Sequence, residues 1–304
     1  MKDKTDSPKI SVIMGIYNQW NKEYLEQAIM SVLRQSFWDF EFLIYNDGSD
    51  SSICEQLERY RQLDNRIVLL HGKENCGLAY SLNTCINAAR GKYLARMDDD
   101  DISAPERFAV QYAYLESHPE SAYVGCNAKL IDDGGAWGTR SMPEFPQKQS
   151  FLRYSPFIHP TVMLRKSIFQ EQEAYRFSAE TWRCEDYELF MRLTKLGYRG
   201  ANIQQELFYY RENSDSYKKR KLRYRLDEMK LRYRNFREMG LLNPFNLLYV
   251  VRPLAAAVVP SRLIYAAKRL YHRRESVCES RQENVPAAAE YHGGGKQSAE
   301  YVHR

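Results

Sequence analysis

The amino-acid sequence predicts an α/β fold with a mixed, mostly parallel sheet flanked by helices, and with a C-terminal helical extension. Short apolar runs alternate with amphipathic segments of helical length over roughly the first hundred residues. The runs are almost continuously apolar, which is typical of parallel strands that are buried on both faces. A chain of 304 residues, 44% of them hydrophobic, is long enough for one large domain with an extension.

The N-terminal half supplies strands with helices between them. Each apolar run ends in polar turn residues, and apolar side chains at helical spacing follow. After the second strand, Gly48 suits a positive φ, and the polar side chains around it can cap the next helix. The expected elements are strand 9–17, helix 24–35, strand 40–45, helix 53–63, strand 66–70, helix 77–90 and strand 92–97.

The following part of the chain is less regular, with Gly- and Pro-rich loops between the apolar runs, and this suits a mixed sheet. One helix carries Leu189, Leu193 and Leu196 at core-facing spacing, and Gly197 ends it. The expected elements are helix 105–117, strands 123–131 and 160–164, helix 185–196 and strand 204–210.

Composition and charge argue against several classes of protein. The net charge of +5, from 44 basic and 39 acidic residues, is too mild to indicate a nucleic-acid partner. The six cysteines form no C-x-x-C pair, so we expect free thiols in a reducing compartment and no structural zinc. The N-terminus lacks the apolar core of a signal peptide, and no apolar stretch is long enough to span a bilayer. These features predict a cytoplasmic protein.

Four consecutive carboxylates, Asp98 to Asp101, follow the strand 92–97. Such a cluster repels itself at the end of a strand. Mg²⁺ or Mn²⁺ removes this cost, because a hard cation takes carboxylate oxygens together with the oxygens of a diphosphate. The carboxyl end of a strand is also where open α/β sheets bind ligands. The cluster indicates a metal–diphosphate site, with a solvated acidic loop that caps the next helix through Ser103 or Asp101 as the alternative.

A basic and then apolar segment follows the predicted sheet. Residues 217–237 have a helical pattern rich in Lys and Arg, whereas residues 241–271 are apolar and broken by Pro244, Pro253 and Pro260. A basic amphipathic segment of this kind can lie in a membrane interface. We favour this interpretation over a helix that packs its apolar side on the domain and keeps a solvated basic face.

These composition changes divide the chain into three parts. Residues 8–212 form the predicted sheet domain, and residues 213–274 form an extension that we expect to dock on a membrane surface. Residues 275–304 are polar and rich in small side chains, which predicts disorder. The expected location is therefore cytoplasmic and peripheral, on the inner face of the cell membrane.

Several short segments are weak signals one by one, but their order and spacing are specific. They are Ser11 to Met14, Tyr17-Asn18, Tyr24-Leu25, Ser31 to Phe37, Asn46 to Ser49, Glu74 to Ala79, Ala89 to Tyr93, Ala95 to Asp101, Glu185 to Leu189 and Tyr210-Arg211. Together they resemble the family 2 glycosyltransferases. The resemblance implies a GT-A fold for residues 8–212 and an inverting transfer from a nucleotide-diphosphate sugar, with a UDP-sugar as the favoured donor. It also implies a hexosyl or N-acetylhexosaminyl group and a glycan or lipid-linked acceptor in cell-surface polysaccharide biosynthesis.

The resemblance assigns the acidic cluster to the D-x-D motif of the family. Asp100 would coordinate Mn²⁺ or Mg²⁺ through the diphosphate, and Asp98 would contact the ribose or a metal-bridging water. Asp99 is grouped with Asp98 among the nucleotide-sugar contacts. Asp47 would accept the N3–H of uracil, and Tyr17 would lie near the base and the ribose.

Asp186 is the candidate catalytic base by the same resemblance. The acceptor hydroxyl must lose its proton as it attacks the anomeric carbon, and one carboxylate within hydrogen-bond reach can take it. In-line attack opposite the leaving group inverts the anomeric centre, and no second catalytic carboxylate is needed. The alternative for Glu185 and Asp186 is a pair of acidic residues that the helix dipole favours in a first turn.

The sequence departs from the family pattern at three places. Gly15 stands where Pro is frequent, and Asn46 stands where Asp is frequent, which weakens the case for uridine. No His follows Tyr210-Arg211, although many members use one at that place for the metal or diphosphate. His159 and Asn213 are the candidates to complete the metal site, and water and substrate alone could also do so.

Two other functions fit the sequence less well than a glycosyltransferase does. A sugar-nucleotide pyrophosphorylase would need a glycine-rich, basic loop after the first strand, and residues 15–19 are neither. A non-enzymatic nucleic-acid or membrane binder could use the basic stretch 218–237, but the mild net charge and the lack of a binding motif argue against it.

Overall fold

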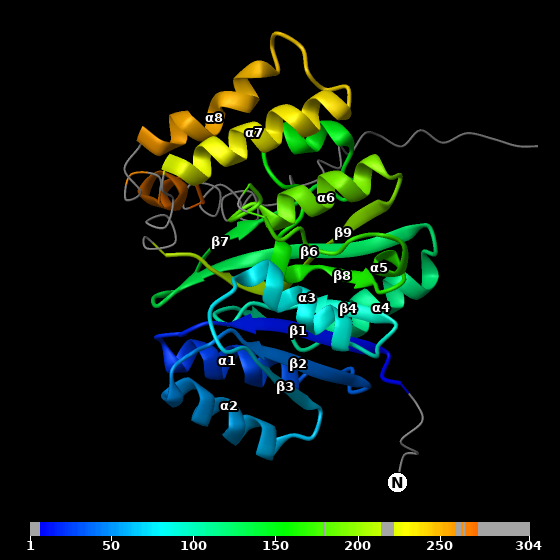
Figure 1. The fold of residues 1–304 in the computed structure, drawn as a ribbon, viewed down its shortest axis with the longest axis vertical. Coiled ribbons are helices and arrows are strands. Elements are labelled where there is room, and N and C mark those ends of the chain that lie inside the picture. The colour runs from blue at the N-terminus through cyan, green and yellow to red at the C-terminus, as the bar shows by residue number, and fades with distance from the viewer. Residues whose placement is uncertain (1–6, 179, 214–221, 259–262, 264, 273–304) are drawn as a thin grey trace, which may run out of the picture.

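The computed structural model describes residues 7–178, 180–213, 222–258, 263 and 265–272. It shows a mixed sheet with helices on both faces and further helices stacked beyond one end (Figure 1). The predicted α/β class is therefore confirmed. The tail 275–304, for which we predict disorder, and the start of the basic stretch lie outside the described residues.

The N-terminal half is a parallel sheet in which β1 lies between β2 and β4. Here β3 extends the sheet beyond β2, so that the strand order is β3-β2-β1-β4. The strands are β1 (Ile10–Ile16), β2 (Phe40–Asn46), β3 (Ile67–His71) and β4 (Tyr93–Arg96), and the helices are α1 (Lys22–Leu33), α2 (Ser51–Leu63) and α3 (Leu78–Ala88).

Alternate side chains of each central strand enter two different cores, because successive residues of a strand point to opposite faces. In β1, Val12 and Met14 belong to the core that α1 and α2 cover, whereas Ile13 belongs to the core that α3 covers. The near-continuous apolar runs of the sequence reflect this burial on both faces. The predicted turn after β2 is confirmed, since Gly48 has φ of +74° and the Asp50 side chain accepts the Ile53 N–H at 3.2 Å.

The second half adds mostly antiparallel strands to the β4 side, in the order β8-β6-β9-β5, with β7 paired to β6. The one parallel pair among the described strands of this half is β6 with β9. The elements are β5 (Ile102–Ser103), α4 (Arg107–Ser117), β6 (Ser121–Asp132), β7 (Gly135–Arg140), β8 (Met163–Arg165), α5 (Ile168–Glu171), α6 (Glu185–Lys195) and β9 (Arg199–Arg211), with 3-10 turns at Lys148–Leu152 and His159–Thr161.

Several local expectations for this half are wrong. The strand expected from Pro160 begins only at Met163, because His159–Thr161 forms a 3-10 turn. Ser103 does not cap the next helix, since it lies in β5, and the N-cap Glu106 of α4 makes no side-chain cap bond. Leu196 is half exposed, because α6 ends before it, whereas Leu189 and Leu193 are buried as expected.

The C-terminal part forms α7 (Leu222–Glu238) and α8 (Leu247–Val258), and residues 265–272 are also helical. Pro253, one of the prolines that interrupt the apolar segment of the sequence, lies inside α8. A proline lacks the N–H that would bond the carbonyl four residues earlier. That carbonyl belongs to Tyr249, and it accepts a hydrogen bond of 3.5 Å from Arg232 of α7 instead.

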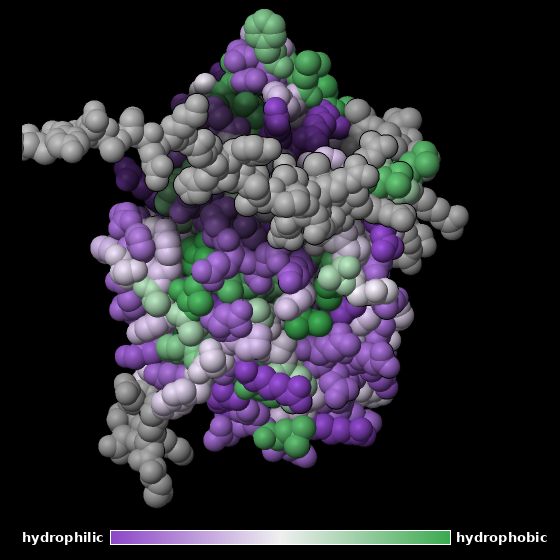
Figure 2. Space-filling view, turned by 180° about the vertical axis from the view of Figure 1, so that it is seen from behind, coloured by the Kyte–Doolittle hydropathy of each residue, from purple (hydrophilic) through white to green (hydrophobic). Residues whose placement is uncertain are grey.

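Apolar side chains gather at the end of the molecule that α7 and α8 form (Figure 2). The exposed ones near the start of α8 are Phe245, Leu247, Leu248 and Val251. Of the helices that the structure describes, none has the length and apolar character needed to cross a membrane. The five cysteines within the described ranges are free thiols; Cys85, Cys126 and Cys184 are buried, whereas Cys54 and Cys76 are only partly buried.

Candidate active site

The carboxyl ends of β1, β2 and β4 lie at one edge of the sheet, because these strands are parallel. The chain moves outward from β1 to β3 and then returns to the other side of β1 with β4, which makes a topological switch point. Ligands of open α/β sheets bind in the crevice at such a point. The structure therefore brings exposed Tyr17, Asp47 and the Asp98–Asp101 loop to the edge where a ligand is expected.

Asp47 is buried in the turn after β2, and both of its carboxylate oxygens are bonded. They accept the backbone N–H groups of Cys76 at 2.9 Å and Gly77 at 2.7 Å. Asp47 thus fixes the start of α3, where Gly77 has φ of +90° and packs against Trp182. A contact of Asp47 with a nucleotide base stays a prediction, and it would use a second lone pair of an oxygen that is already bonded.

Three carboxylates of the acidic loop come together. Among the described residues, Asp98, Asp100 and Asp101 offer oxygens that all lie within 4.8 Å of one another. Burial, and then the neighbouring Asp100 and Asp98, raise the pKa of Asp99 and of Asp101 well above the usual range. The Arg96 guanidinium, buried behind the loop, forms an ion pair with Asp98.

This cluster fits a hard divalent cation. Asp101 is only 1% exposed, yet its Oδ2 has no hydrogen-bond partner. An oxygen-only donor set with excess negative charge and an unpartnered buried oxygen suits Mg²⁺ or Mn²⁺. The sequence predicts Asp98 and Asp100 as the metal ligands within this acidic run. The structure groups Asp101 with these two carboxylates and leaves Asp99 outside the group.

Arg211, at the end of β9, holds the acidic loop from behind. Its backbone N–H donates to Asp101 Oδ1 at 2.6 Å, and its Nε donates to the Asp100 carbonyl at 2.7 Å. The guanidinium also lies 3.7 Å above the Tyr24 ring. The family pattern in the sequence includes the Tyr210-Arg211 pair but indicates no separate role for Arg211.

Asp186 lies in the first turn of α6, which has no side-chain cap. Burial raises the pKa of Asp186, while the Tyr187 N–H, Arg96 and Arg140 act in the opposite direction. Arg96 is therefore close enough to influence Asp186 electrostatically while it pairs with Asp98. The candidate base and the acidic cluster share this buried guanidinium.

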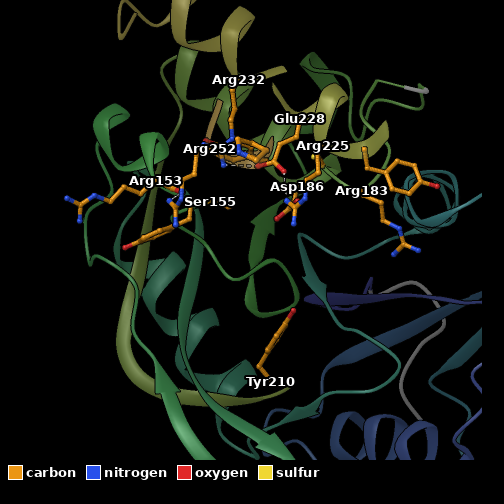
Figure 3. A pocket seen from close by; sticks show the side chains of 14 residues that line it. Arg153, Ser155, Arg183, Asp186, Tyr210, Arg225, Glu228, Arg232 and Arg252 are labelled. Carbon is orange, nitrogen blue, oxygen red and sulfur yellow. Dashed lines mark hydrogen bonds and ion pairs between the residues drawn. The ribbon is translucent and has the colours of Figure 1, made fainter. Parts of the chain in front are cut away.

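A cavity of about 520 Å³ opens in front of Asp186 (Figure 3). Tyr210 lines the same cavity, and it directly precedes Arg211 in β9. Burial chiefly raises the pKa of Tyr210, with further contributions from Asp101, Asp98 and Asp100. Tyr210 thus links the lining of the cavity to its neighbour Arg211, which bonds to the acidic loop.

His159 is not part of the carboxylate cluster. Its Nε2 forms a hydrogen bond of 2.7 Å with the Tyr175 hydroxyl. Burial, and then Arg96, hold the pKa of His159 well below its usual range, so the ring is neutral at neutral pH. That His159 is a metal ligand stays a prediction, and its hydrogen bond to Tyr175 does not favour it. Asn213, the other candidate ligand, is the last residue of a described segment, and its role also stays a prediction.

The mixed sheet, the acidic cluster at its carboxyl edge and the cavity that Asp186 lines fit the GT-A-like glycosyltransferase arrangement that the family resemblance implies. Residues 11–172 match the family described as "Glycosyl transferase family 2". The chain therefore belongs to family 2 of the glycosyltransferases, in which an inverting mechanism is typical.

Two curated relatives support this membership. The chain is 36% identical over 274 residues to "Putative glycosyltransferase EpsE" of Bacillus subtilis (strain 168), and the aligned region covers 89% of this chain and 97% of that protein. It is 32% identical over 222 residues to "O-antigen biosynthesis glycosyltransferase WbnJ" of Escherichia coli, which covers 71% of this chain and 84% of that protein.

Solved structures share the fold at low sequence identity. The mannosyltransferase PcManGT from Pyrobaculum calidifontis, in complex with GDP-Man and Mn²⁺, superimposes with a TM-score of 0.59 and 15% identity over 88% of this chain and 81% of that chain. S. aureus TarS 1–349 in complex with UDP gives a TM-score of 0.57 and 17% identity over 86% of this chain and 91% of that chain.

Proposed function

We propose that this protein is an inverting glycosyltransferase that moves a sugar from a nucleotide-diphosphate sugar to a glycan or lipid-linked acceptor in cell-surface polysaccharide biosynthesis. The observation that carries the proposal is that β9 connects the acidic cluster to a cavity that Asp186 lines, through Arg211 and Tyr210 respectively. UDP-sugars are the first donors to test, since TarS is solved with UDP, and GDP-sugars follow because PcManGT is solved with GDP-Man. The name of WbnJ supports the polysaccharide role.

Asp98 and Asp100, with Asp101 added from the structure, would hold Mn²⁺ or Mg²⁺. Such an ion, when bound, neutralises the diphosphate leaving group, which removes the need for a general acid. Tyr17, Asp47 and Asp99 are the further contacts that we propose for the nucleotide sugar. Tyr17 is exposed at the end of β1, where a base can stack on its ring.

Asp186 would accept the proton of the acceptor hydroxyl. The cavity in front of it gives the acceptor access, and the raised pKa of Asp186 makes the carboxylate a stronger base than an ordinary aspartate. General base catalysis of this kind contributes roughly 10²–10⁴-fold to the rate. The attack then inverts the anomeric centre, so an α-linked donor gives a β-linked product.

The experiment is a screen of UDP-, GDP- and dTDP-sugars with Mn²⁺ or Mg²⁺, by binding and by slow hydrolysis. We expect Asp100→Ala to lose metal-dependent binding and Asp186→Asn to keep binding but lose turnover. Glu55→Ala, an exposed carboxylate of α2, serves as the control that changes neither. If no nucleotide sugar binds with any metal, the proposal is wrong. No observation specifically favours a pyrophosphorylase or a nucleic-acid binder.

We also propose that the C-terminal part docks on the inner face of the cell membrane. Exposed apolar residues near the start of α8 stand beside Arg234 and Arg237 of α7, and this combination suits an anionic lipid surface. Leu248→Asp should reduce co-sedimentation with anionic vesicles. Leu63→Asp, at the end of α2, is the matched control, because Leu63 is 76% exposed and Leu248 is 71% exposed. Equal sedimentation of wild type and Leu248→Asp would contradict docking through α8.

A further inference from the structure

The cavity in front of Asp186 is strongly basic. Five arginines line it against two carboxylates, which are Asp186 itself and Glu228. The arginines come from segments far apart in the chain, so the fold has assembled them: Arg153, Arg183, Arg225, Arg232 and Arg252. A neutral sugar acceptor needs no such excess of positive charge.

Arg232 is engaged within the protein. Its guanidinium donates to Glu228 at 2.9 and 3.0 Å and to the Leu152 carbonyl at 3.0 Å. It also lies over the Tyr187 ring at 4.8 Å. These contacts join α7 to the domain, so Arg232 supports the wall of the cavity.

Arg225 is different, because it is buried and only partly satisfied. It is 9% exposed, and its NH1 donates to Glu228 at 2.9 Å. Its Nε is buried and has no hydrogen-bond partner. A buried guanidinium N–H without an acceptor is costly in a folded protein. Its position in the lining of a cavity points to a ligand that supplies the missing acceptor.

Two further arginines that line the cavity, Arg183 and Arg252, are exposed. Arg183 has φ of +71° and stands directly before the segment that begins α6. Arg252 of α8 uses its NH1 to hold the Arg153 carbonyl at 2.6 Å. In Figure 3 the side chains of Arg225 and Arg252 reach the cavity that Asp186 lines. Guanidinium groups in a fork arrangement match phosphate oxygens better than ammonium groups do.

We propose that this cavity binds an acceptor that carries a phosphate or diphosphate group, with Arg225, Arg183 and Arg252 as its anion site. The inference rests on the proposed function, in which the acceptor hydroxyl faces Asp186. An acceptor sugar with its hydroxyl at Asp186 and a phosphoryl group on its other side would place the anion against these arginines. The cavity volume of about 520 Å³ lies within the usual range for small-molecule sites.

The first test uses inorganic pyrophosphate, the full-length protein and EDTA, so that no metal fills the acidic cluster. We expect calorimetry to show pyrophosphate binding that Arg225→Gln weakens by about tenfold or more, as for other hydrogen bonds to charged groups. Arg223→Gln, at an exposed arginine of the same helix that lines neither this cavity nor the proposed membrane surface, is the matched control. If Arg225→Gln fails to fold, the exposed pair Arg183→Gln with Arg252→Gln takes its place.

A second arm identifies the source of the phosphate. Dodecyl diphosphate is compared with pyrophosphate, and tighter binding of the dodecyl compound assigns a lipid-linked acceptor, whereas equal binding assigns a soluble phosphorylated glycan. With an active donor, the ratio of kcat/KM for a sugar-diphosphate-alkyl acceptor over the matched alkyl glycoside should exceed about ten, and Arg225→Gln should lower this ratio about tenfold.

The inference is overturned if pyrophosphate does not bind, if Arg225→Gln and Arg223→Gln bind it alike, or if phosphorylated and neutral acceptors react equally well. Metal-dependent binding of nucleotide sugars by the wild type is measured in the same series. If the wild type binds no nucleotide sugar, the glycosyltransferase proposal is wrong. If it binds a nucleotide sugar but not pyrophosphate, only the present inference is wrong.

Discussion

Replacement of Asp101 by asparagine should stabilise the protein when metal is absent. Asp101 Oδ1 accepts the Arg211 N–H at 2.6 Å, and an asparagine oxygen can accept the same bond. The negative charge, in contrast, lies within 4.8 Å of two other carboxylates. At an effective dielectric constant of about 20, two unit charges at that separation repel by about 3.5 kcal/mol. Arg96 offsets part of this repulsion through Asp98.

We therefore expect Asp101→Asn to raise the free energy of unfolding by about 1–3 kcal/mol, which corresponds to roughly 2–4 °C in Tm per kcal/mol for a domain of this size. The gain should depend on pH. Burial raises the pKa of Asp101 in the folded protein, so its protonation stabilises the fold at acidic pH, and this stabilisation is lost as the pH rises through the folded pKa. The advantage of asparagine is thus small at low pH and grows toward neutral and alkaline pH.

The assay is thermal unfolding followed by circular dichroism in EDTA, from about pH 5 to about pH 8.5. Added Mn²⁺ should raise the Tm of the wild type more than that of Asp101→Asn, because binding to the folded state stabilises it. Asp64→Asn is the control of opposite sign, since hydrogen bonds from Arg66 lower the pKa of Asp64 and its charge is stabilising. A lower Tm for Asp101→Asn in EDTA, or a gain that does not change with pH, would refute the repulsion argument.

Three further predictions follow from the same structure. Because burial raises the pKa of Asp186 and a base acts only when deprotonated, kcat should fall as the pH drops through that raised pKa; a pH–rate profile that stays flat down to about pH 4 would contradict this. Asp47→Asn should destabilise the fold by about 1–3 kcal/mol in urea unfolding, because an amide can accept only one of the two N–H groups, and unchanged stability would refute it. Gly15→Ala should lower the free energy of unfolding by about 1–3 kcal/mol, because the new Cβ would lie 2.7 Å from Ser81 Cβ. Adding Ser81→Gly to this variant should recover stability. A double variant no more stable than Gly15→Ala would argue against this clash.

The elements that the sequence predicts well are those with a strong local signal. The first four strands are apolar runs followed by turn residues, and the structure has them at nearly the expected bounds. In contrast, β5 has only two residues, and β7 (Gly135–Arg140) is a partly exposed, glycine-rich strand without an apolar run. Both exist because a neighbouring strand pairs with them, and no local pattern encodes that pairing.

The site shows the same division between local and distant information. The acidic run predicts a cation site, but it does not show that Asp101 rather than Asp99 joins the carboxylate group. The Asp101 carboxylate is held by the backbone N–H of Arg211, which lies 110 positions away in the chain. The basic cavity could not be predicted either. Its arginines belong to separate segments, and the basic pattern of residues 217–237 indicates a surface that faces lipid rather than a cavity.

Strand β9 connects the two halves of the site. Tyr210 lines the cavity in front of Asp186, whereas the next residue, Arg211, bonds to Asp100 and Asp101. Successive side chains of a strand point to opposite faces, so one strand serves the cavity in front of Asp186 with one residue and the acidic cluster with the next.

The register of β9 therefore decides whether the site exists. A slip of one residue would move Tyr210 to the face of Arg211 and remove both contacts at once. Two neighbours prevent this slip: Tyr209 pairs with Ile102 of β5, and Tyr210 and Arg211 pair with Leu130 and Ile131 of β6. The short strand β5, which follows the acidic loop directly, thus ties the loop and β9 together. The distance between the acidic cluster and the cavity in front of Asp186 is set by the sheet itself, so it is as rigid as the core beneath it.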